Sequence, residues 1–364
     1  MRLVFVHLGE EFPTHLQMNI NRSMELFPNI SVVLIVNCSQ NLGIYRSSDI
    51  EYFHYKTPVS EYMKKINSSL DLKFRRGFWV YSLMRLDAIV SYMNSTNPGP
   101  IIHVESDVIL MPNFPWDKMN LINNVAWTRY NSVRDSAALI YFPELEKANE
   151  FRRILNQFLG KTSNATDMSV LSRMSHIHLD KFDIFSSLEK PRSALVNSMS
   201  LENFDELGKM SKNFSIFNGI FDAAAFGMWL TGQDPKNSYG NTKVMSMSNI
   251  HNGDSAIDPS KGAYKMENSN LFVDLEDSQI PIWNLHIHSK NLRLFDSNWE
   301  KELKQFVHKS NIGKPYKIVN RRLFLEILIE QKLQGTLFRF LVNMPYLVII
   351  TRLLKQFFKK VGAK

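Results

Sequence analysis

Short apolar runs alternate along the first half of this chain with longer amphipathic stretches. The apolar runs are rich in β-branched residues and predict buried strands at residues 3–7, 31–36, 50–55, 101–110, 125–130 and 136–142. The amphipathic stretches predict helices with one apolar face at residues 15–26, 78–93 and 144–159. Strands that alternate with helices indicate a parallel sheet that helices cover on both faces. The pattern therefore predicts an α/β fold with a Rossmann-type, mostly parallel sheet flanked by helices.

Two acidic residues interrupt the apolar run at residues 101–110. Glu105 and Asp107 stand two residues apart, where a strand is expected to end, and Pro112 follows the second apolar half of the run. Buried carboxylates are costly without a partner, and a hard divalent cation suits their oxygens. The simpler interpretation is an exposed strand end with two solvated acids, since Glu-x-Asp often occurs by chance.

A second group of residues with possible chemistry lies at residues 217–230. Asn218 and Gly219 form a turn signal, and the small and apolar residues that follow include one acid, Asp222. An Asp at a helix start caps the free N–H groups and complements the helix dipole. This position therefore has a structural explanation that needs no ligand.

A third group lies at residues 280–290, which read as a strand. Alternation along a strand would place Asn284, His286 and His288 on one face, with Lys290 close behind. A single His on such a face is ordinarily a satisfied polar group. Two on one face, followed by a Lys, indicate a possible metal or phosphate site.

The net charge of the chain is concentrated at one end. The 364 residues carry a formal charge of +8, yet residues 314–364 alone hold eleven Lys or Arg and two Glu. The remaining chain is close to neutral, so its composition does not indicate a nucleic-acid-binding domain. These numbers divide the chain into a nearly neutral domain at residues 1–313, which the resemblance described below implies is catalytic, and a basic C-terminal segment at residues 314–364.

The C-terminal segment has the composition of helices that lie on a membrane surface. Its longest apolar run, residues 344–350, is far shorter than the roughly 20 residues that a membrane-spanning helix needs. On a helix, Arg352, Lys355, Gln356 and Lys359 share one face, and apolar residues occupy much of the rest. We expect amphipathic helices that bind anionic lipid. Packing of this segment on the catalytic domain or on a second copy in a homo-oligomer is the alternative.

The cellular location follows from two weaker observations. Cys38 is the only cysteine, which excludes an internal disulfide and favours a reducing compartment. The chain opens with a predicted strand that is too short and too soon acidic for a signal peptide. We expect a cytoplasmic protein, peripheral on the cytoplasmic face of the membrane.

Taken in order, the three groups of residues resemble the GT-A class of nucleotide-sugar-dependent glycosyltransferases, over about residues 1–295. In that class an Asp-x-Asp motif and a late His hold Mn²⁺ or Mg²⁺ against a nucleotide diphosphate. The resemblance implies that Glu105, Asp107 and His288 are the metal ligands, with His286 as the alternative to His288. It also implies that Asp222 is the general base if the enzyme inverts, although the usual Glu-Asp pair of the class is Phe221-Asp222 here.

The resemblance further implies which residues bind the nucleotide-sugar. They are Arg85 on the helix before the motif, Ser106 within it, Arg134 and Asp135 in a polar connection, and Lys290 on the diphosphate. The implied activity is hexosyl transfer to a hydroxyl of a glycan or glycolipid acceptor, as in polysaccharide biosynthesis. Two other functions remain open: a metal-dependent phosphodiester or nucleotidyl-transfer enzyme, and a non-catalytic module that docks on membranes.

Overall fold

The computed structural model describes residues 1–9, 12–37, 49–66, 77–159, 166–198, 203–232, 255–275 and 278–311. All of these residues belong to one compact unit. The C-terminal segment that the sequence predicts to be helical lies outside the described residues, so the boundary near residue 313 stays a prediction. No helix in the described ranges is long and apolar enough to cross a membrane.

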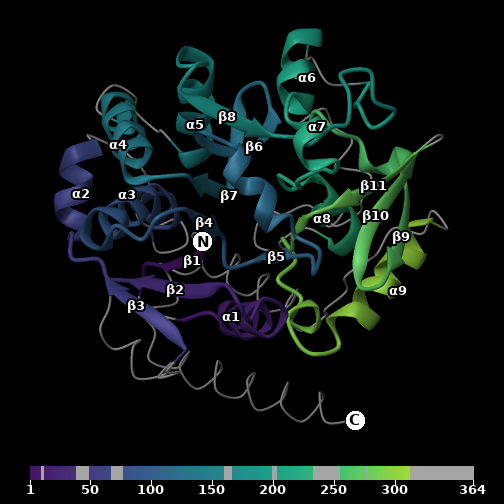
Figure 1. The fold of residues 1–364 in the computed structure, drawn as a ribbon, viewed down its shortest axis with the longest axis horizontal. Helices are drawn as coiled ribbons and strands as arrows, with labels where there is room; N and C mark the ends of the chain where they lie inside the picture. The colour runs from purple at the N-terminus through teal and green to yellow at the C-terminus, as the bar shows by residue number, and fades with distance from the viewer. Residues whose placement is uncertain are drawn as a thin grey trace, which may run out of the picture. The chain divides into compact units, whose positions relative to one another are not determined.

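A seven-stranded sheet forms the centre of this unit, in the order β3-β2-β1-β4-β7-β6-β8 (Figure 1). Its strands are β1 (Arg2–His7), β2 (Ser31–Val36), β3 (Ile50–His54), β4 (Ile101–Val104), β6 (Val125–Asn131), β7 (Arg134–Phe142) and β8 (Phe182–Phe185). Among these described strands, β7 alone runs against the others. The expected fold class, a mostly parallel sheet flanked by helices, is confirmed.

Helices cover both faces of the sheet, because the apolar side chains of each strand alternate between the two faces. On β1, Val4 packs with helices α3 (Phe78–Thr96) and α4 (Leu145–Leu159), whereas Leu3 and Phe5 pack with α1 (Thr14–Leu26). Successive side chains of a strand point to opposite faces, which explains this division. Helices α2 (Val59–Ile66) and α5 (Asp167–Ile177) join the α3 side (Figure 1).

The chain order of the strands defines where a ligand would bind. β1 lies between β2 and β4, because the chain first builds β2 and β3 on one side of β1 and then returns to its other side. In open α/β sheets, ligands bind at this reversal, beyond the carboxyl ends of the strands. Glu105 directly follows the last residue of β4, so it stands at this reversal.

A second layer packs beside the sheet and carries the late residues of the chain. Strand β5 (Val108–Leu110) pairs antiparallel with β12 (Asn284–His286), and β9 (Ala263–Glu267), β10 (Asn270–Leu275) and β11 (Ser278–Ile282) form a small sheet. Helices α8 (Ala225–Thr231) and α9 (Trp299–Asn311) complete an apolar cluster with these strands. The chain also forms a 3-10 helix, η3 (Trp116–Leu121), and the short helices α6 (Phe204–Ser211) and α7 (Phe214–Phe217).

Three expectations about the elements are wrong in detail. The run at residues 101–110 forms two strands, β4 and β5, because the two acids occupy a turn between them. The polar connection at residues 131–135 is a tight hairpin, and Arg134 and Asp135 already belong to β7. The sequence pattern predicts no element between residues 230 and 280, yet the described part of this stretch includes the strands β9 and β10.

Candidate functional site

Glu105 and Asp107 lie in the turn between β4 and β5. The backbone N–H of Glu105 donates to the carbonyl of Ala138 on β7 (2.9 Å), and that of Val108 donates back to the carbonyl of Glu105 (3.1 Å). The turn is therefore tied to the central sheet on one side. On the other side, the N–H of Ile287 donates to the carbonyl of Asp107 (2.7 Å), which joins the turn to the β12 segment.

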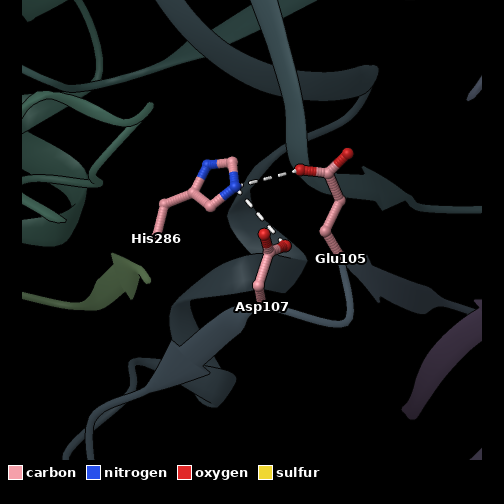
Figure 2. A group of neighbouring side chains, drawn as sticks. All are labelled: Glu105, Asp107 and His286. Carbon is pink, nitrogen blue, oxygen red and sulfur yellow. Dashed lines mark ion pairs between the residues drawn. The ribbon is translucent and has the colours of Figure 1, made fainter. Parts of the chain in front are cut away.

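The pairing of β5 with β12 brings His286 to the two acids. His286 stands opposite Val108 in this antiparallel pair. Its Nε2 lies 3.4 Å from a carboxylate oxygen of Glu105 and 3.4 Å from one of Asp107 (Figure 2). One donor atom from each of the three side chains falls within 4.8 Å of the others. We call these three residues the acid–His cluster.

The imidazole of His286 is oriented by its second nitrogen. Nδ1 lies 3.3 Å from the carbonyl oxygen of Ala223, which can only accept a hydrogen bond. Nδ1 is therefore the donor, and Nε2 faces the carboxylates. This arrangement, with one nitrogen held by a backbone carbonyl, is the usual one for a metal-binding His.

Asp222 holds the β12 segment from behind the cluster. Its side chain is fully buried, and its two oxygens accept hydrogen bonds from the N–H groups of Phe226 (3.0 Å), Gly227 (2.8 Å) and His286 (3.0 Å). Burial raises the pKa of the Asp222 carboxyl, and these hydrogen bonds oppose the rise. A carboxylate so enclosed is poorly placed to reach an acceptor, so the geometry does not favour Asp222 as a general base.

The cluster is strongly charged and largely withdrawn from water. Burial lowers the pKa of His286, but Asp107 and Glu105 outweigh it and raise the pKa to about 9. Burial raises the pKa of Asp107, but His286 and Lys290 hold it well below the usual range. The Lys290 ammonium lies 3.6 Å from the Asp107 carboxylate, and its side chain is 37% exposed. The positive charges of His286 and Lys290 therefore lie beside the two carboxylates that would bind a cation.

The two candidate histidines have different positions. His286 touches the acids, whereas His288 lies against the His286 ring, with ring centroids 4.1 Å apart. Burial, and next the His286 charge, lower the pKa of His288 to about 3. Its Nε2 is buried and has no hydrogen-bond partner among the described residues. The structure thus brings His286 into the cluster in place of His288. The sequence analysis names His286 only as the alternative ligand.

The donor atoms of the cluster fit a divalent cation. At metal–oxygen distances of about 2.1 Å, neighbouring ligands at right angles lie about 3 Å apart. The separations of 3.4 Å from His286 Nε2 to both carboxylates are close to this spacing. The orphaned Nε2 of His288 beside the cluster is a further candidate ligand. The residues present therefore suit a divalent cation, which Glu105, Asp107 and His286 would hold.

Arg85 and Ser106, expected to bind nucleotide-sugar, both have partners within the protein, and Arg85 alone of the two contacts a side chain of the cluster. The Arg85 guanidinium donates to the Glu105 carboxylate through Nη1 and lies 2.9 Å from Asp167 through Nη2. The Ser106 hydroxyl lies 3.1 Å from Nε2 of His15 on α1. Arg85 is therefore a partner of a metal-binding candidate, and Ser106 is held by α1.

Arg134 and Asp135 belong to a different part of the structure. Asp135 is fully buried, where it accepts hydrogen bonds from Trp127 Nε1 (2.7 Å) and Arg129 Nε (2.9 Å). Arg134 is exposed at the first position of β7. The expected contact of Asp135 with a donor sugar does not agree with this placement, because the Asp135 carboxylate is used inside the fold.

Sequence reasoning missed the residues that support the turn from α1. Asn19 donates to the carbonyls of Ser106 (3.2 Å) and Val108 (2.7 Å), and Arg22 donates to that of Leu110 (2.9 Å). These side chains satisfy the edge of β5 with which none of the described strands pairs. Two buried polar residues three positions apart on a helix were the available signal.

Comparison with known proteins gives partial similarities. No family model and no curated protein matches the sequence. Among solved structures, the galactosyltransferase LgtC with donor and acceptor sugar analogues is similar over 51% of this chain and 74% of its own, at 11% identity and a TM-score of 0.38. The PaToxG glycosyltransferase covers 49% and 69%, at 10% identity and a TM-score of 0.34. The apo glycosyltransferase GlyE of Streptococcus pneumoniae TIGR4 covers 59% and 50%, at 13% identity and a TM-score of 0.32.

Proposed function

We propose that this chain is a metal-dependent glycosyltransferase. It would move a sugar from a nucleotide-sugar to a hydroxyl of a glycan or lipid-linked glycan. The observation that carries the proposal is the acid–His cluster at the carboxyl end of β4, with Lys290 beside it. An acid pair from mid-chain and a late imidazole at the reversal point of a mostly parallel sheet suit a nucleotide diphosphate held through a cation.

The chemistry of the cluster favours Mn²⁺ over Mg²⁺. Carboxylate oxygens suit both ions, but an imidazole nitrogen is a poor ligand for Mg²⁺ and an acceptable one for Mn²⁺. His286 Nε2 is aimed between the two carboxylates and would be one of the ligands. We therefore expect tighter binding of Mn²⁺ than of Mg²⁺.

The residues of the site would act mainly on the leaving group. A bound divalent cation would neutralise the negative charge that grows on the leaving diphosphate. The Lys290 ammonium, which is more than a third exposed, can reach the same diphosphate as a compact positive charge. Asp222 would act by holding the backbone of His286 and not by accepting the proton of the acceptor hydroxyl.

A panel of nucleotide-sugars with Mn²⁺ tests the proposal directly. We expect release of a free nucleoside diphosphate from at least one donor, because a glycosyltransferase breaks the bond between sugar and diphosphate. Release of a nucleoside monophosphate would instead identify phosphodiester or nucleotidyl transfer, which could use the same acids. No turnover, with nucleotide binding unchanged by Asp107→Asn, would identify a non-catalytic module.

Matched variants show whether the cluster carries the activity. Asp107→Asn removes one carboxylate charge from the cluster and should lower turnover by at least about 100-fold, because the metal loses a ligand. Asp117→Asn makes the same change on the exposed η3 helix and should leave turnover within about twofold. Equal activity of the two variants would contradict the assignment.

A further inference from the structure

Asp167 is a buried acid close to the acid–His cluster that the sequence did not single out. It is the first residue of α5, and only 5% of its surface is exposed. An Asp in the first turn of a helix ordinarily stays in water and complements the helix dipole. The carboxylate of Asp167 instead faces inward, and its Oδ2 lies 2.9 Å from Nη2 of Arg85.

Arg85 connects Asp167 to the cluster. Its Nη1 donates to Oε1 of Glu105, and the other oxygen of that carboxylate, Oε2, lies 3.4 Å from His286 Nε2. Figure 2 shows Glu105 with one oxygen toward His286 and the other turned away. Arg85 thus occupies one oxygen of Glu105 and leaves a single oxygen for a cation.

The positive charge of Arg85 explains why its contact with Glu105 needs a second acid, Asp167. The Arg85 side chain is 11% exposed, so its positive charge is poorly screened by water. Paired with Glu105 alone, this charge would repel a divalent cation at the same carboxylate. With Asp167 on its other nitrogen, the Arg85–Asp167 pair is neutral, and the negative charges of Glu105 and Asp107 stay available to the cation.

We propose that Asp167 is a positioning residue that acts through Arg85, fixing the guanidinium and neutralising it so that Glu105 presents one oxygen to a divalent cation. This inference rests on the proposed function, since it names a further residue of the same metal site. It gives Asp167 no contact with the substrate or with the cation. Its effect should therefore disappear when Arg85 is removed.

A double-mutant cycle on the 364-residue chain tests whether Asp167 acts through Arg85. Mn²⁺ is titrated calorimetrically into wild type, Asp167→Asn, Arg85→Gln and the double variant, and urea unfolding of each metal-free protein is measured alongside. We expect Asp167→Asn to weaken the Kd for Mn²⁺ about 10- to 100-fold, the range for partners of metal ligands. In the Arg85→Gln background the same change should alter the Kd by less than about twofold.

Two further variants separate this role from helix stability. Asp205→Asn removes an exposed Asp from the first turn of α6 and should leave Mn²⁺ binding unchanged. Asp167→Glu keeps the charge and should recover most of the affinity that Asp167→Asn loses. If Asp167→Asn does not fold, Asp167→Ser, which removes the same charge with a smaller polar side chain, is titrated in its place and should weaken Mn²⁺ binding in the same range.

The outcomes distinguish this inference from the proposed function. Mn²⁺ binding by wild type with an unchanged Kd in Asp167→Asn would overturn the role of Asp167 and leave the metal site intact. An equal effect of Asp167→Asn with and without Arg85 would also overturn it, because the acid would then not act through the guanidinium. Wild type that binds no Mn²⁺ would overturn both proposals.

Discussion

Each side chain of the acid–His cluster is fixed by a partner outside the cluster. Arg85 holds Glu105, the carbonyl of Ala223 holds Nδ1 of His286, and Lys290 lies beside Asp107. Ligands held in this way need little movement when a cation arrives, although Nε2 of His286 must release its proton to bind the metal. At the scale of single residues, the site is therefore built before any ligand is present.

The two histidines give a prediction at this scale. His286→Ala should weaken Mn²⁺ binding at least about 100-fold, because it removes a donor atom aimed at both carboxylates. His288→Ala should have a smaller effect, since His288 lies behind His286 in the resting arrangement. Calorimetric Mn²⁺ titration of both variants checks this, and a larger loss with His288→Ala would show that His288 is the principal ligand.

The choice between these histidines shows where sequence reasoning stopped. Alternation correctly placed His286 and His288 together, and their rings do lie against each other. Which one reaches the acids depends on the register between β12 and β5, where His286 stands opposite Val108. That register is a contact between distant segments, so no local pattern reveals it. Asp167 was missed for a related reason, because the sequence predicts no element around it and its partner Arg85 lies 82 positions away.

At the scale of elements, the close approach of α8 to β12 sets the position of His286. A Cβ atom on Gly227 would lie 1.9 Å from the carbonyl oxygen of His286, closer than any real contact. Only a residue without a side chain lets the helix start come this near the strand. Asp222 then bridges the two elements, since its oxygens bind N–H groups of both.

Alanine substitutions test this packing with a matched pair. Gly227→Ala should lower the free energy of unfolding by about 1–3 kcal/mol or more, because α8 must move away from β12. Gly208→Ala on α6 meets nothing within 4 Å and should be neutral or stabilising by up to about 1 kcal/mol. Urea unfolding measures both, and equal stability of the two variants would contradict the close approach.

Buried tyrosines on the sheet and its helices predict loss of stability at high pH. Burial raises the pKa of Tyr141 on β7 to about 12, and burial and then Asp87 raise that of Tyr55. An unfolded tyrosine has a pKa of about 10. A raised folded pKa contributes stability that is fully present below pH 10 and is lost as the pH rises through the folded pKa.

Unfolding measured in urea between pH 8 and pH 11.5 checks this expectation. The free energy of unfolding should fall above pH 10, with Tyr141 contributing up to roughly 2 kcal/mol of the total fall by pH 11.5. Tyr141→Phe should reduce the slope, because phenylalanine has no proton to lose.

The element pattern was predictable because it depends on local alternation of residue types. β2 has the bounds that the sequence gives, and β1, β3 and the helices α1, α3 and α4 differ from prediction by a few residues. The run at residues 101–110 was misjudged because its acids lie in a turn between β4 and β5. The second of these strands pairs with the distant strand β12, which no local pattern reveals. Asp135 was misjudged because its partner Arg129 lies across the β6–β7 hairpin.

For the molecule as a whole, the sequence predicts a second functional segment, residues 314–364, which lies outside the described residues. Residues 314–364 combine eleven basic residues with apolar ones. We propose that this segment binds an anionic membrane surface and brings the catalytic domain to a lipid-linked acceptor at the cytoplasmic face.

Liposome flotation tests the membrane proposal. The full chain should float with vesicles that contain anionic lipid and should bind them less at high salt, because screening weakens the attraction of basic residues. A chain that ends at residue 314 should stay in the soluble fraction. Equal behaviour of the two chains would remove the membrane proposal while leaving the metal site untouched.

The antiparallel pairing of β5 with β12 has a consequence for how the protein is made. The ribosome releases Glu105 and Asp107 long before it has synthesised His286, so a nascent chain holds the two acids without their imidazole. Mn²⁺ affinity should therefore appear only once β12 has emerged and docked. Cation binding would then report that synthesis has passed this strand.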